Sequence, residues 1–68
     1  MSAVWTRPAE SSVKKWLTDI EGVHQKLTPW ELSFIESITA WVERRGIISL
    51  TREQLERVEE IYAKRTPL

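Results

Sequence analysis

Proton-transfer chemistry has one natural carrier in this sequence, the single histidine His24. As a general base, His24 would need a carboxylate to orient its ring, and Asp19 or Glu21 is near enough in the sequence to supply one. Nothing in the spacing requires such a pair, and the sequence contains neither a glycine-rich phosphate loop nor a nucleophile motif. We therefore expect His24 to lie in a connecting loop and the protein not to be an enzyme.

Metal-ligand chemistry is equally sparse. The sequence has no cysteine and one histidine, so a zinc site would lack its usual ligands. Acidic residues do cluster near the C-terminus, but basic residues interleave with them at i, i+4 spacing, which is typical of a solvated helix face. The acidic residues are Glu53, Glu56, Glu59 and Glu60, and the basic residues are Arg52, Arg57, Lys64 and Arg65. We expect no metal and no cofactor.

The four tryptophans are the residues best suited to binding, because an exposed indole ring removes a large area from water at a low entropy cost. Trp16 and Trp41 fall on apolar helix faces and are predicted to be core residues. Trp30 falls in the first turn of a helix, where part of its ring is expected to stay exposed. Trp5 falls outside any periodic face, and is expected to be either an interface residue or a lid over the core.

Two groups of basic residues offer contacts to nucleic acid. Arg44, Arg45 and Arg52 flank the segment 46–50, and Lys14 and Lys15 lie nearer the N-terminus. The glutamates near the C-terminus would repel phosphates if their helix entered a major groove. Ten basic and ten acidic residues give no net charge, which argues against a domain that depends on phosphate contacts. Nucleic-acid binding is therefore the alternative and not the leading hypothesis.

Two of the three predicted helices begin with the same motif. Thr28 and Glu31 have the spacing of a capping box, as have Thr51 and Gln54, and apolar residues at helical intervals follow each pair. Gly46 is expected to end the first of these helices, and Pro67 lies where the second should stop.

The third predicted helix covers residues 9–21 and comes first in the chain. Its apolar side chains follow i, i+3, i+4, i+7 spacing from Val13 onward. Pro8 in the first turn, or a cap at Ser11 or Ser12, would begin it, and Gly22 would end it.

These elements predict one all-α domain over residues 1–68, with residues 1–8 as a flexible N-terminal arm. The short segment 46–50 makes the second and third helices an antiparallel hairpin, across which the first helix packs in a compact three-helix bundle. Its apolar residues Ile47, Ile48 and Leu50 are expected to plug the end of the core. No apolar run approaches the roughly 20 residues that span a bilayer, and residues 1–8 do not read as a signal peptide. We expect a cytoplasmic protein.

Residues 27–65 also resemble the short helical accessory proteins that bacteriophages encode for replication and repair, among them the one encoded beside the UvsW helicase of T-even-type phages. The resemblance is carried by three stretches of sequence: Leu27-Thr28-Pro29-Trp30-Glu31, Phe34-Ile35-Glu36-Ser37-Ile38 and Glu59-Glu60-Ile61-Tyr62-Ala63-Lys64, together with Leu50, Thr51 and Gln54. It implies a phage or prophage origin, a host-cell cytoplasmic location and a helical accessory domain working near nucleic-acid enzymes. The fold of that phage relative is similar to the auxiliary domain of RecQ-type helicases, which contacts DNA weakly through a basic surface.

The leading hypothesis is a non-enzymatic module that docks on a larger host or phage protein, which it inhibits or assists. Its predicted contact residues are Trp5, Trp30, Arg44, Arg45 and Arg52. A nucleic-acid-binding accessory domain would use Lys14 and Lys15 with the same three arginines. A homodimer that pairs its own exposed apolar faces is the third possibility, so the protein is expected to be a monomer or a homodimer.

Overall fold

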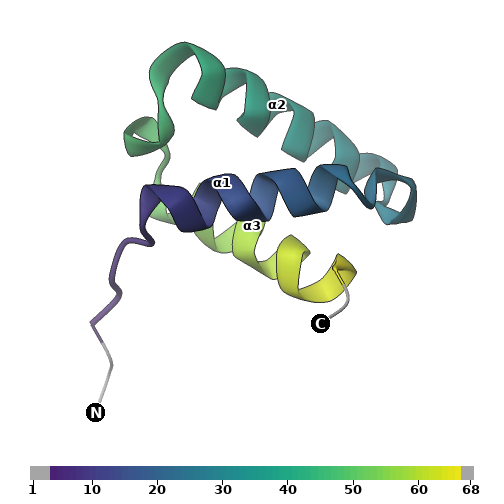
Figure 1. The fold of residues 1–68 in the computed structure, drawn as a ribbon, viewed down its shortest axis with the longest axis horizontal. Helices are drawn as coiled ribbons and strands as arrows, with labels where there is room; N and C mark the ends of the chain where they lie inside the picture. Colours follow the sequence, from purple (N-terminus) through teal and green to yellow (C-terminus); the bar gives the residue numbers. More distant parts are fainter. Residues whose placement is uncertain (1–3, 67–68) are drawn as a thin grey trace.

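Three α-helices joined by two 3₁₀ turns make up the computed structural model, which describes residues 4–66. In chain order, the elements are α1 (Glu10–Glu21), η1 (His24–Lys26), α2 (Pro29–Arg45), η2 (Ile47–Ser49) and α3 (Arg52–Arg65). Successive helices run in opposite directions (Figure 1). The predicted all-α fold with three helices is confirmed. None of the described helices is both long and apolar enough to cross a membrane.

The starts of α2 and α3 are built as the sequence predicted. The Thr28 hydroxyl accepts a hydrogen bond from the Glu31 backbone N–H at 3.1 Å, and the Glu31 carboxylate accepts one from the Thr28 N–H at 2.9 Å. The Thr51 hydroxyl and the Gln54 side chain make the same reciprocal pair, at 3.2 Å and 2.8 Å. Each box satisfies two backbone N–H groups that a helix start leaves without partners.

The start of α1 and the ends of α1 and α2 depend less on side-chain hydrogen bonds. The first helix begins at Glu10 after Ala9, which has no side-chain cap, so the predicted caps at Ser11 and Ser12 were wrong: both residues lie inside the helix. The helix ends at Gly22 in ordinary helical geometry, with φ of −65°. Gly46 ends α2 with φ of +82°, a conformation that favours glycine. The stop predicted at Pro67 lies outside the described residues.

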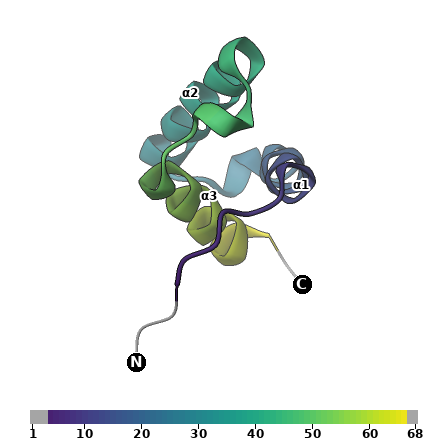
Figure 2. The same ribbon diagram turned by 90° about the vertical axis from the view of Figure 1, so that its left-hand side faces the viewer.

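The core lies mainly between α1 and α3, which make the most extensive helix–helix contact. Their buried residues pack with two residues from α2 and two from the segment between α2 and α3, which we call the second connection. The full set is Val13, Ile20, Ile35, Ile38, Ile47, Leu50, Leu55, Val58 and Ile61. Figure 2 shows α1 and α2 lying apart, with α3 below and between them. The packing of α1 on α3 thus exceeds that of α2 on α3, although α2 and α3 are the pair joined by the shorter connection.

The connection between α2 and α3 plugs the core with two of its three predicted residues. Ile47 and Leu50 are buried, but Ile48 is 81% exposed, so its predicted core position was wrong. The 3₁₀ turn at residues 47–49 explains the difference, because it directs successive side chains about 120° apart, and only one of the two isoleucines can then face inward.

Among residues 4–66, Glu31 is the one buried acidic residue, and its carboxylate links two helices. Besides its part in the capping box, it accepts hydrogen bonds from Arg65 of α3, from Nε at 2.9 Å and from Nη2 at 3.3 Å. The backbone hydrogen bond from Thr28, followed by the Arg65 guanidinium, lowers the pKa of this carboxyl despite the opposing effect of its burial. The start of α2 is thereby tied to the end of α3.

Candidate functional site

Three aromatic side chains lie along one face of α2, beside the core-facing side and not within it. Trp30, Phe34 and Trp41 fall within roughly 40° of one another around the helix axis, at about 100° per residue. Trp30 is 57% exposed, Trp41 is 40% exposed and Phe34 is half-buried. The rings of Trp30 and Phe34 stack, with centroids 5.4 Å apart and planes 5° from parallel. We call these three residues the aromatic stripe.

Guanidinium groups cover both tryptophans of the aromatic stripe. Arg57 of α3 lies over the Trp30 ring with its central carbon 5.3 Å from the centroid, and Arg45 of α2 lies over Trp41 at 4.5 Å. The negative face of an indole ring attracts such cations, and the planar guanidinium stacks well on it. The contacts favour one orientation of each exposed ring.

Trp41 was predicted to be a core residue, and that prediction was wrong. The core side of α2 is formed by Ile35 and Ile38, and position 41 lies well to one side of them. The indole N–H of Trp41 instead donates a hydrogen bond to the Ser49 hydroxyl at 2.7 Å, and that hydroxyl donates to the Gly46 carbonyl oxygen at 2.7 Å. Trp41 is therefore fixed against the second connection at the molecular surface. Trp16, by contrast, packs against the core and lies 5.9 Å from the Tyr62 ring.

Trp5 lies on a different side of the molecule from the aromatic stripe. It is half-buried and packs against the core, and its ring is covered by Arg52 at 5.1 Å. Arg52 and Arg57, which cover Trp5 and Trp30 respectively, lie roughly 140° apart around α3. Of the two expectations for Trp5, this placement favours the lid.

The described part of the N-terminal arm is attached to the second connection. The Arg7 guanidinium donates hydrogen bonds to the carbonyl oxygens of Ile47 and Leu50, at 2.8 Å and 2.9 Å. These bonds and the packing of Trp5 hold residues 5–7 beside the start of α3. The flexibility expected of residues 1–8 stays a prediction, since residues 1–3 lie outside the described part.

Three of the five predicted nucleic-acid contacts are engaged by carboxylates. Lys14 pairs with Glu10 at 3.4 Å, Lys15 with Asp19 at 2.8 Å and Arg52 with Glu56 at 3.5 Å. The hydrogen bond that Lys15 donates to the Asp19 carboxylate, and a second that it donates to the Tyr62 hydroxyl oxygen at 3.2 Å, raise the pKa of Lys15. Arg44 and Arg45 are exposed at the end of α2. The five cations are thus divided between α1 and the two helix ends that flank the second connection, and three of them are paired with acidic side chains.

The geometry offers little to general-base or metal chemistry within the described residues. His24 is exposed, and its Nδ1 lies 3.1 Å from the backbone oxygen of Glu21 and not from a carboxylate. Asp19, the other predicted partner of His24, is paired with Lys15. Among residues 4–66, no three His, Cys, Asp or Glu side chains gather closely enough to hold a metal ion.

Sequence reasoning did not single out Phe34 and Arg57, which contact the Trp30 ring, and it placed Ile48 in the core. The positions of Phe34 and Trp41 relative to Trp30 were a usable signal, because all three fall on the edge of the apolar arc and not at its centre. The role of Arg57 had no such signal, since it depends on how α3 lies against α2.

Comparison with known protein-family models, with curated protein sequences and with solved structures finds no match to this chain. The resemblance of residues 27–65 to phage accessory proteins therefore remains a hypothesis.

Proposed function

We propose that this protein is a non-enzymatic binding module that docks on a larger protein through the aromatic stripe of α2. The observation that carries the proposal is the exposure of Trp30 and Trp41 on one helix face, each beneath an arginine. Tryptophan and arginine are the residues most enriched among those that dominate binding energy at protein interfaces. Arg44, at the same end of α2, extends the contact set, and Ile48 adds an exposed apolar side chain there.

The fixed geometry of the aromatic stripe supports this function. Stacking of Trp30 on Phe34 and the hydrogen bond from Trp41 to Ser49 limit the rotamers of both indoles before any partner arrives. A preorganised side chain loses less entropy on binding than a free one, so more of its desolvation energy appears as affinity. In this proposal α2 and α3 act as an antiparallel hairpin that presents the stripe, with Arg57 contributed by α3.

The kind of partner is suggested by the sequence resemblance. A small helical accessory protein of a phage or prophage would act in the host cytoplasm, on a host enzyme or on a protein of DNA replication or repair. Docking there would either block the partner's own contacts or recruit it. Trp5, which was predicted as a contact, is left out of the proposed surface because it is committed to the core.

Capture from a nuclease-treated bacterial lysate tests the proposal. We expect tagged wild-type protein to retain a stoichiometric protein partner, and the Trp30→Ala, Trp41→Ala double variant to lose it. A double variant on the outer face of α3, Glu53→Ala with Glu59→Ala, is the matched control and should retain the partner. Equal retention by the stripe variant would contradict the proposal.

The same tagged and purified proteins test the two alternative functions, nucleic-acid binding and self-association. Capture that disappears when nuclease is added would favour the accessory domain that binds nucleic acid, and such binding should also weaken steeply with salt. Sedimentation of the purified protein tests self-association. A wild-type dimer that the stripe variant converts to a monomer would mean that the aromatic stripe binds a second copy.

A further inference from the structure

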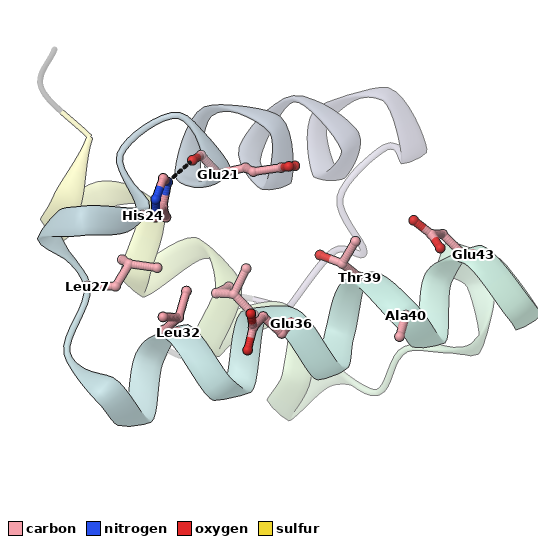
Figure 3. Close-up of a pocket in the computed structure, with 9 residues that line it drawn as sticks. Glu21, His24, Leu27, Leu32, Glu36, Thr39, Ala40 and Glu43 are labelled. Carbon is pink, nitrogen blue, oxygen red and sulfur yellow. Dashed lines mark hydrogen bonds between the residues drawn. The ribbon is translucent and has the colours of Figure 1, made fainter.

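A groove with an apolar floor runs between α2 and the segment that joins it to α1. Its volume is about 480 Å³. Figure 3 shows its lining residues on α2 on one side, and on the end of α1 and η1 on the other. The groove exists because α1 packs mainly on α3, so that only the end of α1 and η1 approach this side of α2.

The floor of the groove is made of aliphatic side chains. Leu27 and Leu32 are half-buried, Ile35 is 5% exposed, and Ala40 extends the apolar surface along α2. Leu27 and Leu32 are the two residues that flank the capping box of α2 at the spacing of a hydrophobic staple. An apolar face that could cover them would remove aliphatic surface from water, which is the main source of binding energy available here.

The rim of the groove is acidic. Glu21 lies at the end of α1, and Glu36 and Glu43 lie on α2 (Figure 3). All three residues are exposed. Neither lysine nor arginine is found among the nine residues drawn around it. Three carboxylates around an apolar floor favour an occupant that carries positive charge at the edges of an apolar face.

The dimensions and lining favour a helix as that occupant. From Leu32 to Glu43 the groove follows α2 for about 16 Å, the length of three helical turns. The long wall of the groove is α2, whose backbone groups are paired within the helix and cannot hydrogen-bond an extended peptide. A helix satisfies its own backbone and needs only side-chain contacts, as in other helix-in-groove complexes.

We propose that this groove binds an amphipathic helix of a partner protein whose apolar face is bordered by lysine or arginine. The site is separate from the aromatic stripe, because its residues lie on roughly the opposite side of α2. The groove would be a second docking surface of the protein, and it would select a partner helix that carries positive charge.

Synthetic helices test the groove without knowledge of the partner. The probe is a peptide of about 15 residues with leucines at i, i+3, i+4 and i+7 and lysines beside them, a length at which isolated helices begin to form. A second peptide replaces each lysine by glutamate, and a third keeps the lysines but scrambles the leucines. We expect the first peptide to bind at least about tenfold more tightly than either of the others.

Amide chemical shifts locate the binding. The first peptide should move the signals of Thr39, Ala40 and Glu43, while the indole N–H signals of Trp30 and Trp41 stay in place. Shifts confined to the indole signals would overturn the proposal that the peptide binds in the groove, and would leave the aromatic stripe as the docking surface.

Charge-neutral variants complete the test. Glu36→Gln with Glu43→Gln should weaken the first peptide about fivefold at low salt. Glu53→Gln with Glu59→Gln removes the same charge from α3 and should leave its affinity unchanged. Equal weakening by both double variants, or equal binding of the scrambled peptide, would mean attraction to net charge alone and would overturn the proposal. Dimerisation of the wild-type protein that Glu36→Gln with Glu43→Gln abolishes would assign the groove to a second copy and would also overturn it.

Discussion

At the scale of single residues, the Glu31 carboxylate takes part in more hydrogen bonds than any other side-chain group described above. It closes the capping box of α2 and accepts two hydrogen bonds from Arg65, while only 7% of the residue is exposed. The sequence predicted the first of these contacts, because a capping box is encoded within four consecutive residues. It could not predict the second, because Arg65 lies on another helix and reaches Glu31 only through the fold.

The Glu31→Gln variant tests how much the charge of Glu31 contributes. Glutamine keeps an oxygen that accepts the Thr28 N–H but removes the negative charge that faces Arg65. We expect the free energy of unfolding to fall by about 1 kcal/mol, the scale of a partly exposed ion pair, as measured by urea denaturation. The exposed Glu59→Gln change is the control and should alter the unfolding free energy little. A Glu31→Gln protein as stable as wild type would mean that the negative charge facing Arg65 contributes nothing to stability.

The pH dependence of the free energy of unfolding should also reveal the contribution of the Glu31 charge. The folded protein holds the pKa of Glu31 below its ordinary value of 4.5, so the charged carboxylate stabilises the folded state. That stabilisation is complete above the unfolded pKa and disappears as pH falls through the lowered folded pKa. The difference in unfolding free energy between wild type and Glu31→Gln should therefore be constant near neutral pH and shrink below about pH 4.5. A difference that grew on acidification would contradict this account.

At the scale of elements, α2 has three distinct faces. One faces the core through Ile35 and Ile38, one carries the aromatic stripe, and the third forms the floor and rim of the groove. The sequence predicted where α2 and α3 begin, because their caps are local hydrogen bonds. The prediction that Trp41 is a core residue was wrong, because the sequence of a wide apolar arc does not determine which part of the arc packs against another helix.

The end of α2 depends on the backbone of Gly46. Its φ of +82° is costly for any residue with a Cβ atom, although open space surrounds the position that a Cβ would take. Gly46→Ala should therefore lower the free energy of unfolding by about 1 kcal/mol through backbone strain alone. Gly22→Ala is the matched control, because Gly22 is already helical; it should change the free energy of unfolding by less than about 0.5 kcal/mol. Equal effects of the two variants, measured by thermal or urea unfolding, would argue against the strained geometry at Gly46.

At the scale of the whole molecule, the main question is which helices pair. The sequence predicted three helices and the short connection, and from these a hairpin of α2 and α3 with α1 across it. The structure gives the larger contact to α1 and α3, which is how α2 comes to have two faces without a neighbouring helix. Periodicity could not reveal this, because each helix carries an apolar face and the pairing depends on how those faces fit together.

The arm takes part in this arrangement through Arg7, which joins residue 7 to the second connection. Removing its two hydrogen bonds by Arg7→Ala should lower the free energy of unfolding by about 1 kcal/mol and expose Trp5 to a soluble fluorescence quencher. Arg44→Ala, at an exposed position at the end of α2, is the control and should do neither. If quenching of tryptophan fluorescence is unchanged in Arg7→Ala, Arg7 does not hold the arm in place.

The central claim is that the aromatic stripe is where this protein meets its partner. Oxidative footprinting, read by mass spectrometry on the free protein and on the captured complex, tests it most directly. We predict that Trp30 and Trp41 react readily in the free protein and are protected in the complex, while the reactivity of Trp16 is the same in both. Undiminished oxidation of Trp30 and Trp41 in a stoichiometric complex would contradict the claim.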